Sequence, residues 1–353
     1  MALTLDARAL LRPDSAGASA LERAQEAVEQ AAQALARGAL VGLPTETVYG
    51  LAADADQAQA VGRIFEAKGR PKDHPLIVHL AGANAAQWQA GVAHYARELP
   101  AFALQLMQAF WPGPLTLILP RKPEIGAASA GGQDSIGLRC PAHPVAQAVL
   151  QACQRLGVQG LAAPSANRFG RVSPTSAEHV RAEFGAQLSD AELLILDGGP
   201  CPVGIESTIV DCSRGRPVLL RPGMVGIDAL EAVLGQPVAL RDQAAPKASG
   251  TLESHYAPTA RVRLMPQAEM QAALDLLGSE ASQIAIYTRQ PIHSPSPDLL
   301  LRYMPTRADA CAQELFAVLR ELDQPGIRLI WVETPPTDPA WDGVRDRLQR
   351  AAA

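Results

Sequence analysis

The stretch GLPTETVYGLAAD, residues 42–54, joins an apolar run to a cluster of polar side chains. The apolar residues ALVGL at 39–43 are typical of a buried strand, and Pro44 would end that strand. Two threonines flank a glutamate at 45–47, and Gly50 lets the chain turn soon afterwards. Polar groups at the end of a rigid strand are typical of binding loops, so this stretch predicts a functional loop at the edge of a sheet.

Composition limits the class of protein. The 353 residues are 48% hydrophobic and 4% aromatic, which favours a globular chain with aliphatic cores. The formal net charge of −5 argues against a protein that mainly wraps nucleic acid. Five cysteines without a C-x-x-C pair argue against a disulfide scaffold or a zinc ribbon. Since no segment approaches the roughly 20 apolar residues of a membrane span, we expect a cytoplasmic protein without a membrane contact.

Apolar runs and amphipathic segments alternate through residues 1–235. Strands are expected at 39–43, 76–80, 115–119, 135–139, 160–164, 192–197, 207–211 and 218–221, and helices near 19–38, 58–67, 101–110, 145–156, 176–184 and 229–234. Near-continuous apolar strands separated by helices predict an α/β sheet that is covered on both faces. Because the strands between 195 and 220 have no helices between them, we expect a mixed sheet rather than a purely parallel one.

The composition changes after Gly235. Residues 236–259 are rich in proline and small residues without clear periodicity, which is typical of a linker. The alternation then starts again, with strands expected at 261–265, 283–288, 299–304 and 328–333 and helices at 268–278, 308–323 and 342–352. We predict a first α/β domain at 1–235, a linker at 236–259 and a smaller, Rossmann-like α/β domain at 260–353.

Common nucleotide, metal and hydrolase signatures are missing from the sequence. It has no G-x-x-x-x-G-K-[ST] loop, no G-x-G-x-x-G after a strand, no H-E-x-x-H and no G-x-S-x-G. We therefore expect neither a P-loop nor a protein-bound catalytic metal nor the nucleophile of an acyl hydrolase.

Polar residues gather instead at the ends of expected strands. In KGRPKDHPLIVH (68–79), two prolines stiffen a loop with three cations, although solvated surface cations are the simpler interpretation of that loop alone. His79 is equally well explained as a hydrogen-bonded core histidine. Further on, Thr175 and Glu178 have the spacing of a capping box. That box would place the N–H groups of a helix N-terminus just after Ser173, where a phosphate could bind.

Several of these blocks together resemble one known family. LPTETVYGLAAD, KGRPKDHPLIVH, WPGPLTLIL, GLRCPAHP, APSANRFGRVSPT, GIESTIVD, LLRPG and SHYAP occur in the order found in the L-threonylcarbamoyladenylate synthases, the YrdC-like family. The resemblance covers about residues 20–258, and the added C-terminal domain is similar to that of the longer, two-domain members. It implies a twisted, open α/β sheet with a large, positively charged concave face.

The resemblance also implies a reaction and its partners. L-threonine, bicarbonate and ATP would give threonylcarbamoyl-AMP and pyrophosphate, with Mg²⁺ carried by the triphosphate. A separate tRNA threonylcarbamoyl transferase complex would use the product to form N6-threonylcarbamoyladenosine in tRNAs that read ANN codons. A weak contact of this chain with tRNA stays open, as do its oligomeric state and the surface that meets the transferase.

The matching motifs imply roles for single residues. The threonine shell would comprise Thr47, His79, Arg139, the backbone of Ala163 and Ser207. The ATP shell would comprise Arg70, His74, Ser135, Ser165, Asn167, Ser173, Arg221 and Tyr256. The candidates for catalytic roles are Lys68, Arg70 and Glu46. Arg139 would face the substrate carboxylate, whereas Glu46 is an acid among anions that either orients its loop or handles a proton.

Two of these assignments carry structural expectations. His74 stands where many family members have asparagine; either side chain donates a hydrogen bond, and the histidine would add sensitivity to pH. Tyr256 lies in the expected linker, which would therefore fold over the nucleotide as a lid.

Two other functions fit parts of the pattern. An RNA-binding module could use the same basic surface without making an adenylate, and salt-sensitive RNA binding without threonine-dependent pyrophosphate release would favour it. Carbamoyl transfer in hydrogenase maturation uses a related domain. That larger protein carries C-x-x-C pairs and an acylphosphatase region, which this chain lacks.

Overall fold

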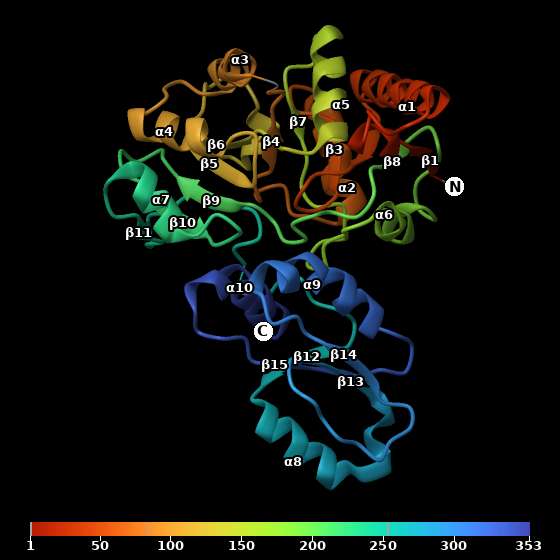
Figure 1. The fold of residues 1–353 in the computed structure, drawn as a ribbon. Coiled ribbons are helices and arrows are strands. Elements are labelled where there is room, and N and C mark those ends of the chain that lie inside the picture. Colours follow the sequence, from red (N-terminus) through yellow and green to blue (C-terminus); the bar gives the residue numbers. More distant parts are fainter. Residues whose placement is uncertain (1, 83, 253) are drawn as a thin grey trace.

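The computed structural model of the chain describes residues 2–82, 84–252 and 254–353. Two α/β units lie one above the other in Figure 1, each built around its own sheet. We call them the large unit, which carries β1 to β11, and the small unit, which carries β12 to β15. Residues 241–260 form the connecting segment between them.

The elements of the large unit follow the alternation expected from the apolar runs. Its strands are β1 (Leu3–Asp6), β2 (Leu40–Leu43), β3 (Gly50–Asp54), β4 (Ile77–His79), β5 (Leu115–Pro120), β6 (Ser135–Arg139), β7 (Leu161–Ala162), β8 (Leu193–Asp197), β9 (Thr208–Asp211), β10 (Val218–Arg221) and β11 (Ala239–Leu240). Its helices are α1 (Ala18–Ala36), α2 (Ala58–Lys68), α3 (Ala85–Tyr95), α4 (Ala101–Phe110), α5 (Pro144–Arg155), α6 (Ala177–Phe184) and α7 (Ile227–Leu234), with short 3-10 turns η1 (Arg8–Leu11) and η2 (Ala127–Ala130).

The large sheet is open and mixed, as the sequence predicts. Its strand order is β1-β8-β2-β3-β7-β4-β6-β5-β9-β10-β11. Strands β1, β8 and β2 are parallel, whereas β3 pairs antiparallel with both β2 and β7. Strands β4 and β6 are parallel and place His79 opposite Arg139 in the register, so the ends of these two strands deliver both side chains to one edge.

Residues of the central strands alternate between two cores. Val41, Leu43 and Leu161 belong to a core with α1 and α5. Leu40 and Leu51 belong to a second core with α2, α3, α4, α6 and α7. This alternation follows the two-residue period of a strand, and it explains why both faces of β2 are apolar and covered.

The connecting segment packs on one face of the large sheet at strands β5, β9 and β10. Ile118, Ile209 and Val218 form a small apolar cluster on this face, and Ala245 and Ala248 pack against it. The connecting segment is therefore held to the sheet by apolar contacts as it runs toward the small unit.

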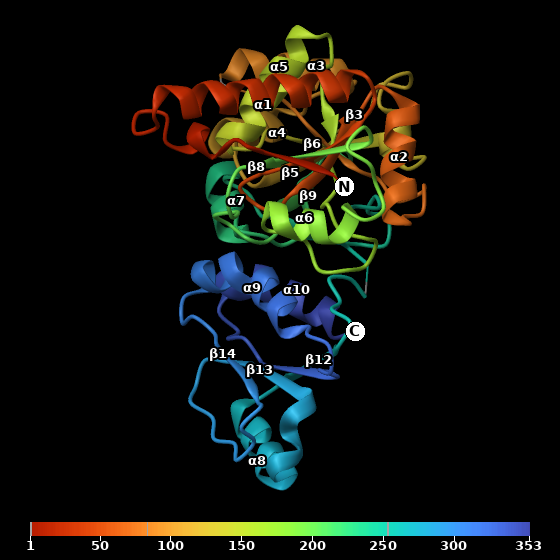
Figure 2. The same cartoon turned by 90° about the vertical axis from the view of Figure 1, so that its right-hand side faces the viewer.

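The small unit contains a parallel sheet with the order β12-β15-β13-β14. Its elements are β12 (Arg261–Met265), α8 (Gln267–Leu277), η3 (Gly278–Gln283), β13 (Ile284–Thr288), β14 (Leu300–Tyr303), α9 (Ala308–Leu322), β15 (Leu329–Glu333), η4 (Pro339–Trp341) and α10 (Asp342–Ala351). Helix α8 covers the outer face, whereas α9 and α10 lie between the sheet and the large unit (Figure 2). Helices on both faces of a parallel sheet are the Rossmann-like arrangement that was expected.

Several local features differ from the sequence-based expectations, and strand β1 and helix α3 lie where no element was expected. Residues 50–54, expected within the loop after β2, form the buried strand β3. The cap of α6 is Ser176, whose hydroxyl accepts a hydrogen bond from His179 N, and not Thr175. Strand β11 forms inside the stretch expected as a linker and pairs with β10. The cap was misplaced by one residue because two hydroxyl residues are adjacent and only the backbone angles distinguish them.

All five cysteines are free and buried. Among the helices that the structure describes, none combines the length and apolar character needed to cross a membrane.

Candidate active site

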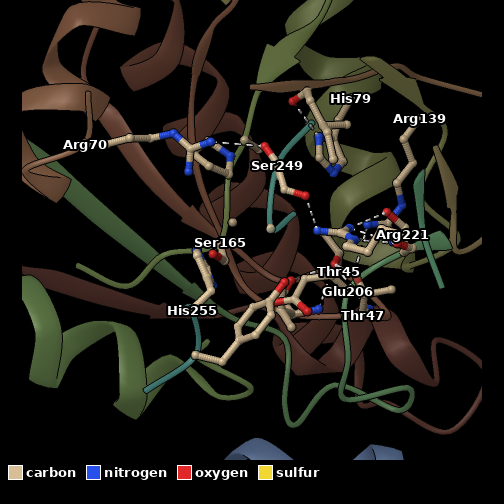
Figure 3. Close-up of a pocket in the computed structure, with 18 residues that line it drawn as sticks. Thr45, Thr47, Arg70, His79, Arg139, Ser165, Glu206, Arg221, Ser249 and His255 are labelled. Carbon is tan, nitrogen blue, oxygen red and sulfur yellow. Dashed lines mark hydrogen bonds between the residues drawn. The ribbon is translucent and has the colours of Figure 1, made fainter. Parts of the chain in front are cut away.

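A pocket lies where the ends of β4, β6 and β10 and the loops after β2 and β7 meet the connecting segment (Figure 3). Its lining consists of Thr45, Thr47, Val48, Gly50, Arg70, Ile77, His79, Arg139, Ala163, Pro164, Ser165, Glu206, Ser207, Arg221, Ser249, Gly250, His255 and Tyr256. The structure thus brings together all five residues of the predicted threonine shell and four of the eight residues of the predicted ATP shell, namely Arg70, Ser165, Arg221 and Tyr256.

The loop PTET is folded around its first threonine. Thr45 Oγ1 donates to Val48 O at 2.6 Å and accepts from the backbone N–H groups of Thr47 and Val48 at 3.2 and 3.3 Å. These bonds turn the chain between β2 and β3, so that Thr47 Oγ1 accepts from Arg139 Nη1 at 2.8 Å. The polar sequence after β2 therefore builds a tight turn that presents Thr47 to the pocket.

Arg139 ends β6 and is buried at this turn. Its Nη2 lies 2.7 Å from Glu46 Oε1, and its Nε donates to Gly113 O at 3.3 Å. Glu46 does not line the pocket; its carboxylate pairs with the guanidinium. The two roles foreseen for Glu46 were to orient its loop or to handle a proton; the pair with Arg139 ties that loop to the end of β6.

His79 is neutral beside Arg139. Burial, followed by the nearby charge of Arg139, lowers the pKa of His79 to about 3. Its Nδ1 lies 3.3 Å from Ile77 O within its own strand. A neutral imidazole can contribute a hydrogen bond to a ligand without adding a second charge next to the guanidinium.

Arg221 joins the ends of β9 and β10. Its Nε and Nη2 donate to Ser207 O at 3.1 and 2.8 Å, and Nη2 also donates to Ser207 Oγ at 3.2 Å. Ser207 Oγ lies 2.8 Å from Thr116 Oγ1 on β5. Ser207, which was assigned to the threonine shell, is therefore bonded directly to an arginine that was assigned to ATP.

Arg70 reaches the pocket from the loop after α2. Its Nη2 donates to Pro75 O at 3.0 Å and to Ser249 Oγ at 3.3 Å, and its guanidinium lies 5.6 Å from the centre of the Phe169 ring. Burial lowers the pKa of Arg70 to about 10. Arg221 Nη1 donates to Ser249 O at 2.9 Å, so the two arginines hold Ser249 between them (Figure 3).

The remaining predicted residues lie behind or beside the lining. Lys68 Nζ is buried and bonds to the backbone carbonyls of Ser165 and Asn167. Asn167 Nδ2 donates to Arg168 O and Arg171 O at 2.8 and 2.9 Å. Both side chains thus hold the loop that carries Ser165 to the pocket. This contact supports a positioning role for Lys68.

Three other members of the predicted ATP shell do not line the pocket. Ser135 lines a neighbouring pocket that shares Ile77 and Ser249 with the first. His74 is partly exposed with its ring 5.3 Å from Phe169, and burial lowers its pKa. Ser173 is fully buried and donates to Glu206 Oε1.

The site also contains residues that were not assigned from the sequence. Thr45, Glu206, Ser249 and His255 line the pocket. Thr45, Glu206 and His255 lie within blocks that carried the resemblance, so proximity to assigned residues was an available signal. Ser249 lies in the linker without a recognisable pattern, and its place became evident only when the connecting segment folded onto Arg70 and Arg221.

The electrostatic character of the pocket is set by three buried arginines. Arg70, Arg139 and Arg221 are between 2% and 8% exposed. Across the residues with described positions, no three or more His, Cys, Asp or Glu side chains are grouped to hold a metal ion. A pocket of this kind suits a small, multiply charged anion.

Comparison with known proteins decides the family. Residues 33–223 match the Sua5, YciO and YrdC family model, described as telomere recombination, and residues 225–353 match the model described as the threonylcarbamoyl-AMP synthase C-terminal domain. The chain is 36% identical over 344 residues to the threonylcarbamoyl-AMP synthase of Pyrococcus abyssi, with 94% of this chain and 96% of the relative covered. The chain belongs to the threonylcarbamoyl-AMP synthase family.

Other members of the threonylcarbamoyl-AMP synthase family agree over similar lengths. The Bacillus subtilis enzyme is 36% identical over 335 residues, with 92% of both chains covered. The crystal structure of P. abyssi Sua5 complexed with L-threonine matches the fold with a TM-score of 0.83 at 31% identity, covering 100% of this chain and 97% of that one. These relatives favour an enzyme over the RNA-binding module and extend the likeness through the small unit.

Proposed function

We propose that the pocket binds L-threonine, bicarbonate and ATP and releases threonylcarbamoyl-AMP and pyrophosphate. The observation that carries the proposal is the convergence of Arg70, Arg139 and Arg221, all buried, on one pocket of a chain in the threonylcarbamoyl-AMP synthase family. The reaction joins two anions, and fixed cations in a site that excludes water reduce their repulsion most effectively.

Threonine is assigned to the half of the pocket around Arg139. Thr47, His79, Ala163 and Ser207 surround this half, and the related P. abyssi structure contains L-threonine. Arg139 would pair with the substrate carboxylate, because a guanidinium matches a carboxylate with two parallel hydrogen bonds. The Glu46 pair would hold the guanidinium in place before the amino acid arrives.

ATP is assigned to the half around Arg70 and Arg221. Ser165 and Tyr256 line the same half, and the buried Tyr256 hydroxyl has no hydrogen-bond partner among the residues described. Both arginines at present bind Ser249, so the triphosphate would have to replace that contact. Mg²⁺ would arrive with the triphosphate as part of the substrate.

Positioning and charge account for the proposed acceleration. The threonine amine and bicarbonate form a carbamate with loss of water; a carbamate oxygen then attacks the α-phosphorus, and pyrophosphate leaves. The hydroxyls of Thr45, Thr47 and Ser207 are engaged with backbone, threonine or arginine groups, so none of these three is arranged as a nucleophile. The arginines would therefore act by aligning the two reactants and by stabilising the charge on the departing pyrophosphate.

The product would be passed on rather than used by this chain. A mixed anhydride of a carbamate and AMP is a reactive acyl donor, which suits transfer by a separate tRNA threonylcarbamoyl transferase complex. A cytoplasmic location would place the enzyme with that tRNA.

Pyrophosphate release tests the proposal. We expect release from ATP with bicarbonate and threonine, and much less with serine in place of threonine. Arg70→Ala should weaken the apparent binding free energy of ATP by about 2–5 kcal/mol, because it removes a buried charge contact. The reaction should then need a much higher ATP concentration. Arg97→Ala, at an exposed arginine, is the matched control. Salt-sensitive RNA binding without threonine-dependent release would instead favour the RNA-binding module.

A further inference from the structure

Arg347 belongs to α10 of the small unit, but its side chain is completely buried against the large unit. Its Nε donates to Glu206 Oε2 at 2.8 Å and its Nη2 donates to Glu206 O at 3.0 Å. Its Nη1 donates to Pro222 O at 2.7 Å. One side chain of the small unit thus binds two backbone carbonyls and a carboxylate of the large unit.

The groups that Arg347 holds adjoin the pocket. Glu206 lines the pocket and precedes Ser207, and Pro222 follows Arg221. The second oxygen of the Glu206 carboxylate accepts the hydroxyl hydrogen of Ser173. Both oxygens of Glu206 are therefore occupied, one by a residue assigned to ATP and one by the small unit.

Close packing holds α9 and α10 against the loop that precedes Glu206. A Cβ atom at Gly343 of α10 would lie 2.8 Å from Ile205 Cδ1, immediately before Glu206. A Cβ atom at Gly204 would collide with the backbone oxygens of Ala312 and Gln313 on α9, and Gly204 has a positive φ of 82° that favours glycine. The loop before Glu206 is thus held between α9 and α10.

Glu206 places a negative charge where the proposed substrates are anions. Burial alone would raise the pKa of this carboxyl, but the charges of Arg347 and Arg221 outweigh burial and hold its pKa below the ordinary value. Without Arg347, a buried carboxylate would remain beside the triphosphate with less compensation. The Arg347 guanidinium carbon also lies 5.5 Å from the centre of the Tyr256 ring.

We propose that Arg347 is a positioning residue for the nucleotide half of the site: it neutralises Glu206, keeps that carboxylate turned toward Ser173, and fixes the backbone beside Ser207 and Arg221. The inference rests on the proposed function and extends it, because it makes the small unit part of the active-site architecture. The effect should fall mainly on ATP, whose assigned residues Ser173 and Arg221 adjoin these contacts.

The test compares Arg347→Met, Arg347→Lys and the double variant R347M/E206Q in the full chain, with Arg345→Met as the matched control. Arg345 lies on the same helix and bonds to Pro336 O and Asp338 O, inside the small unit. Binding of α,β-methylene ATP is measured by calorimetry, and pyrophosphate release gives kcat and KM for ATP and for threonine. Thermal unfolding of each variant is recorded alongside.

We expect R347M to weaken analogue binding by about tenfold or more and to raise KM for ATP more than KM for threonine, since it leaves a buried charge unpaired. R347K should recover part of this loss. R347M/E206Q should recover more, because it removes the uncompensated carboxylate, whereas loss of packing alone would leave the double variant no better than R347M.

Two results would overturn the inference. One is equal analogue binding by R347M and R345M. The other is a double variant that binds the analogue no better than R347M does. If R347M does not fold, the contradicting result is a double variant that binds the analogue more than about tenfold more weakly than the wild type does. Wild-type protein without threonine-dependent pyrophosphate release would count against the proposed function, and the analogue measurements would still decide the role of Arg347.

Discussion

At the scale of single residues, the site depends on side chains whose ionisation is set by burial. His79 has a pKa of about 3, and burial lowers the pKa values of His179 to about 4 and of His255 to about 3. An unfolded chain would protonate each of these imidazoles near pH 6.5. The folded protein therefore binds fewer protons than the unfolded chain in mildly acidic solution.

This difference predicts a loss of stability in acid. The contribution of neutral His79 is fully present above about pH 6.5 and decreases as the pH falls toward 3, by up to about 1.4 kcal/mol per pH unit. His79→Asn should reduce the dependence of the unfolding free energy on pH by about that amount between about pH 6 and about pH 5. Urea unfolding at several pH values measures it, with the exposed His293→Asn as control. An unchanged slope in His79→Asn would contradict the burial argument.

At the scale of elements, the connecting segment lines one side of the pocket through a turn that requires glycine. Gly250 has a φ of 68°, and a Cβ atom there would collide with the Tyr256 hydroxyl and lie 2.7 Å from Arg221 Nη1. The segment is also held by Ser249 Oγ, which donates to Pro75 O at 2.8 Å. The position of the segment thus depends on one permissive backbone position and a few polar contacts.

Gly250→Ala should therefore open the segment. We expect faster proteolysis within residues 241–256 and weaker binding of the ATP analogue, because the added methyl group pushes Tyr256 and Arg221 apart. Gly278→Ala is the control, since Gly278 also has a positive φ but its Cβ would meet no atom within 4 Å. If Gly250→Ala retained the wild-type cleavage pattern, the segment would not be held by this turn.

The elements also show what can be predicted from sequence and what cannot. Strands such as β5 and β8 were predicted because their apolar runs are nearly continuous. Strand β3 was not, because GLAAD is short, lacks β-branched residues and follows turn signals. In the site, Thr47 and Arg139 came from local motifs. The contact between Glu206 and Arg347 could not be predicted from a local motif, because the two residues are 141 positions apart and only docking of the two units brings them together.

At the scale of the whole molecule, the two units share one apolar core. Val48, Val172 and Ile205 of the large unit pack in the same cluster as Phe316 and Val344 of the small unit. Units that share a core lose that burial together, so they should unfold in one step. Arginines at the same interface add polar contacts that only the docked state provides.

We expect calorimetry to show a single unfolding transition, and Arg320→Met to lower its midpoint. Arg320 of α9 bonds to Val172 O and pairs with Glu183 Oε1 at 2.8 Å, both in the large unit. Replacing Arg320 leaves Val172 O and Glu183 without this cation and should lower the free energy of unfolding by about 1–3 kcal/mol. Arg302→Met, which removes an exposed pair with Glu321, should shift the midpoint far less. Two separate transitions in the wild type would disprove the coupling.

The contacts of Ser249 impose a sequence of events on the reaction. Ser249 O and Oγ accept hydrogen bonds from Arg221 and Arg70, at the same pocket that Thr47 and Arg139 line. Under the proposed assignment of ATP to these two arginines, a triphosphate would have to displace Ser249 before it could bind them. Under that assignment the protein would alternate between a form in which Ser249 occupies the two arginines and a form in which ATP does, and crystals of the first form should not take up a nucleotide soaked into them.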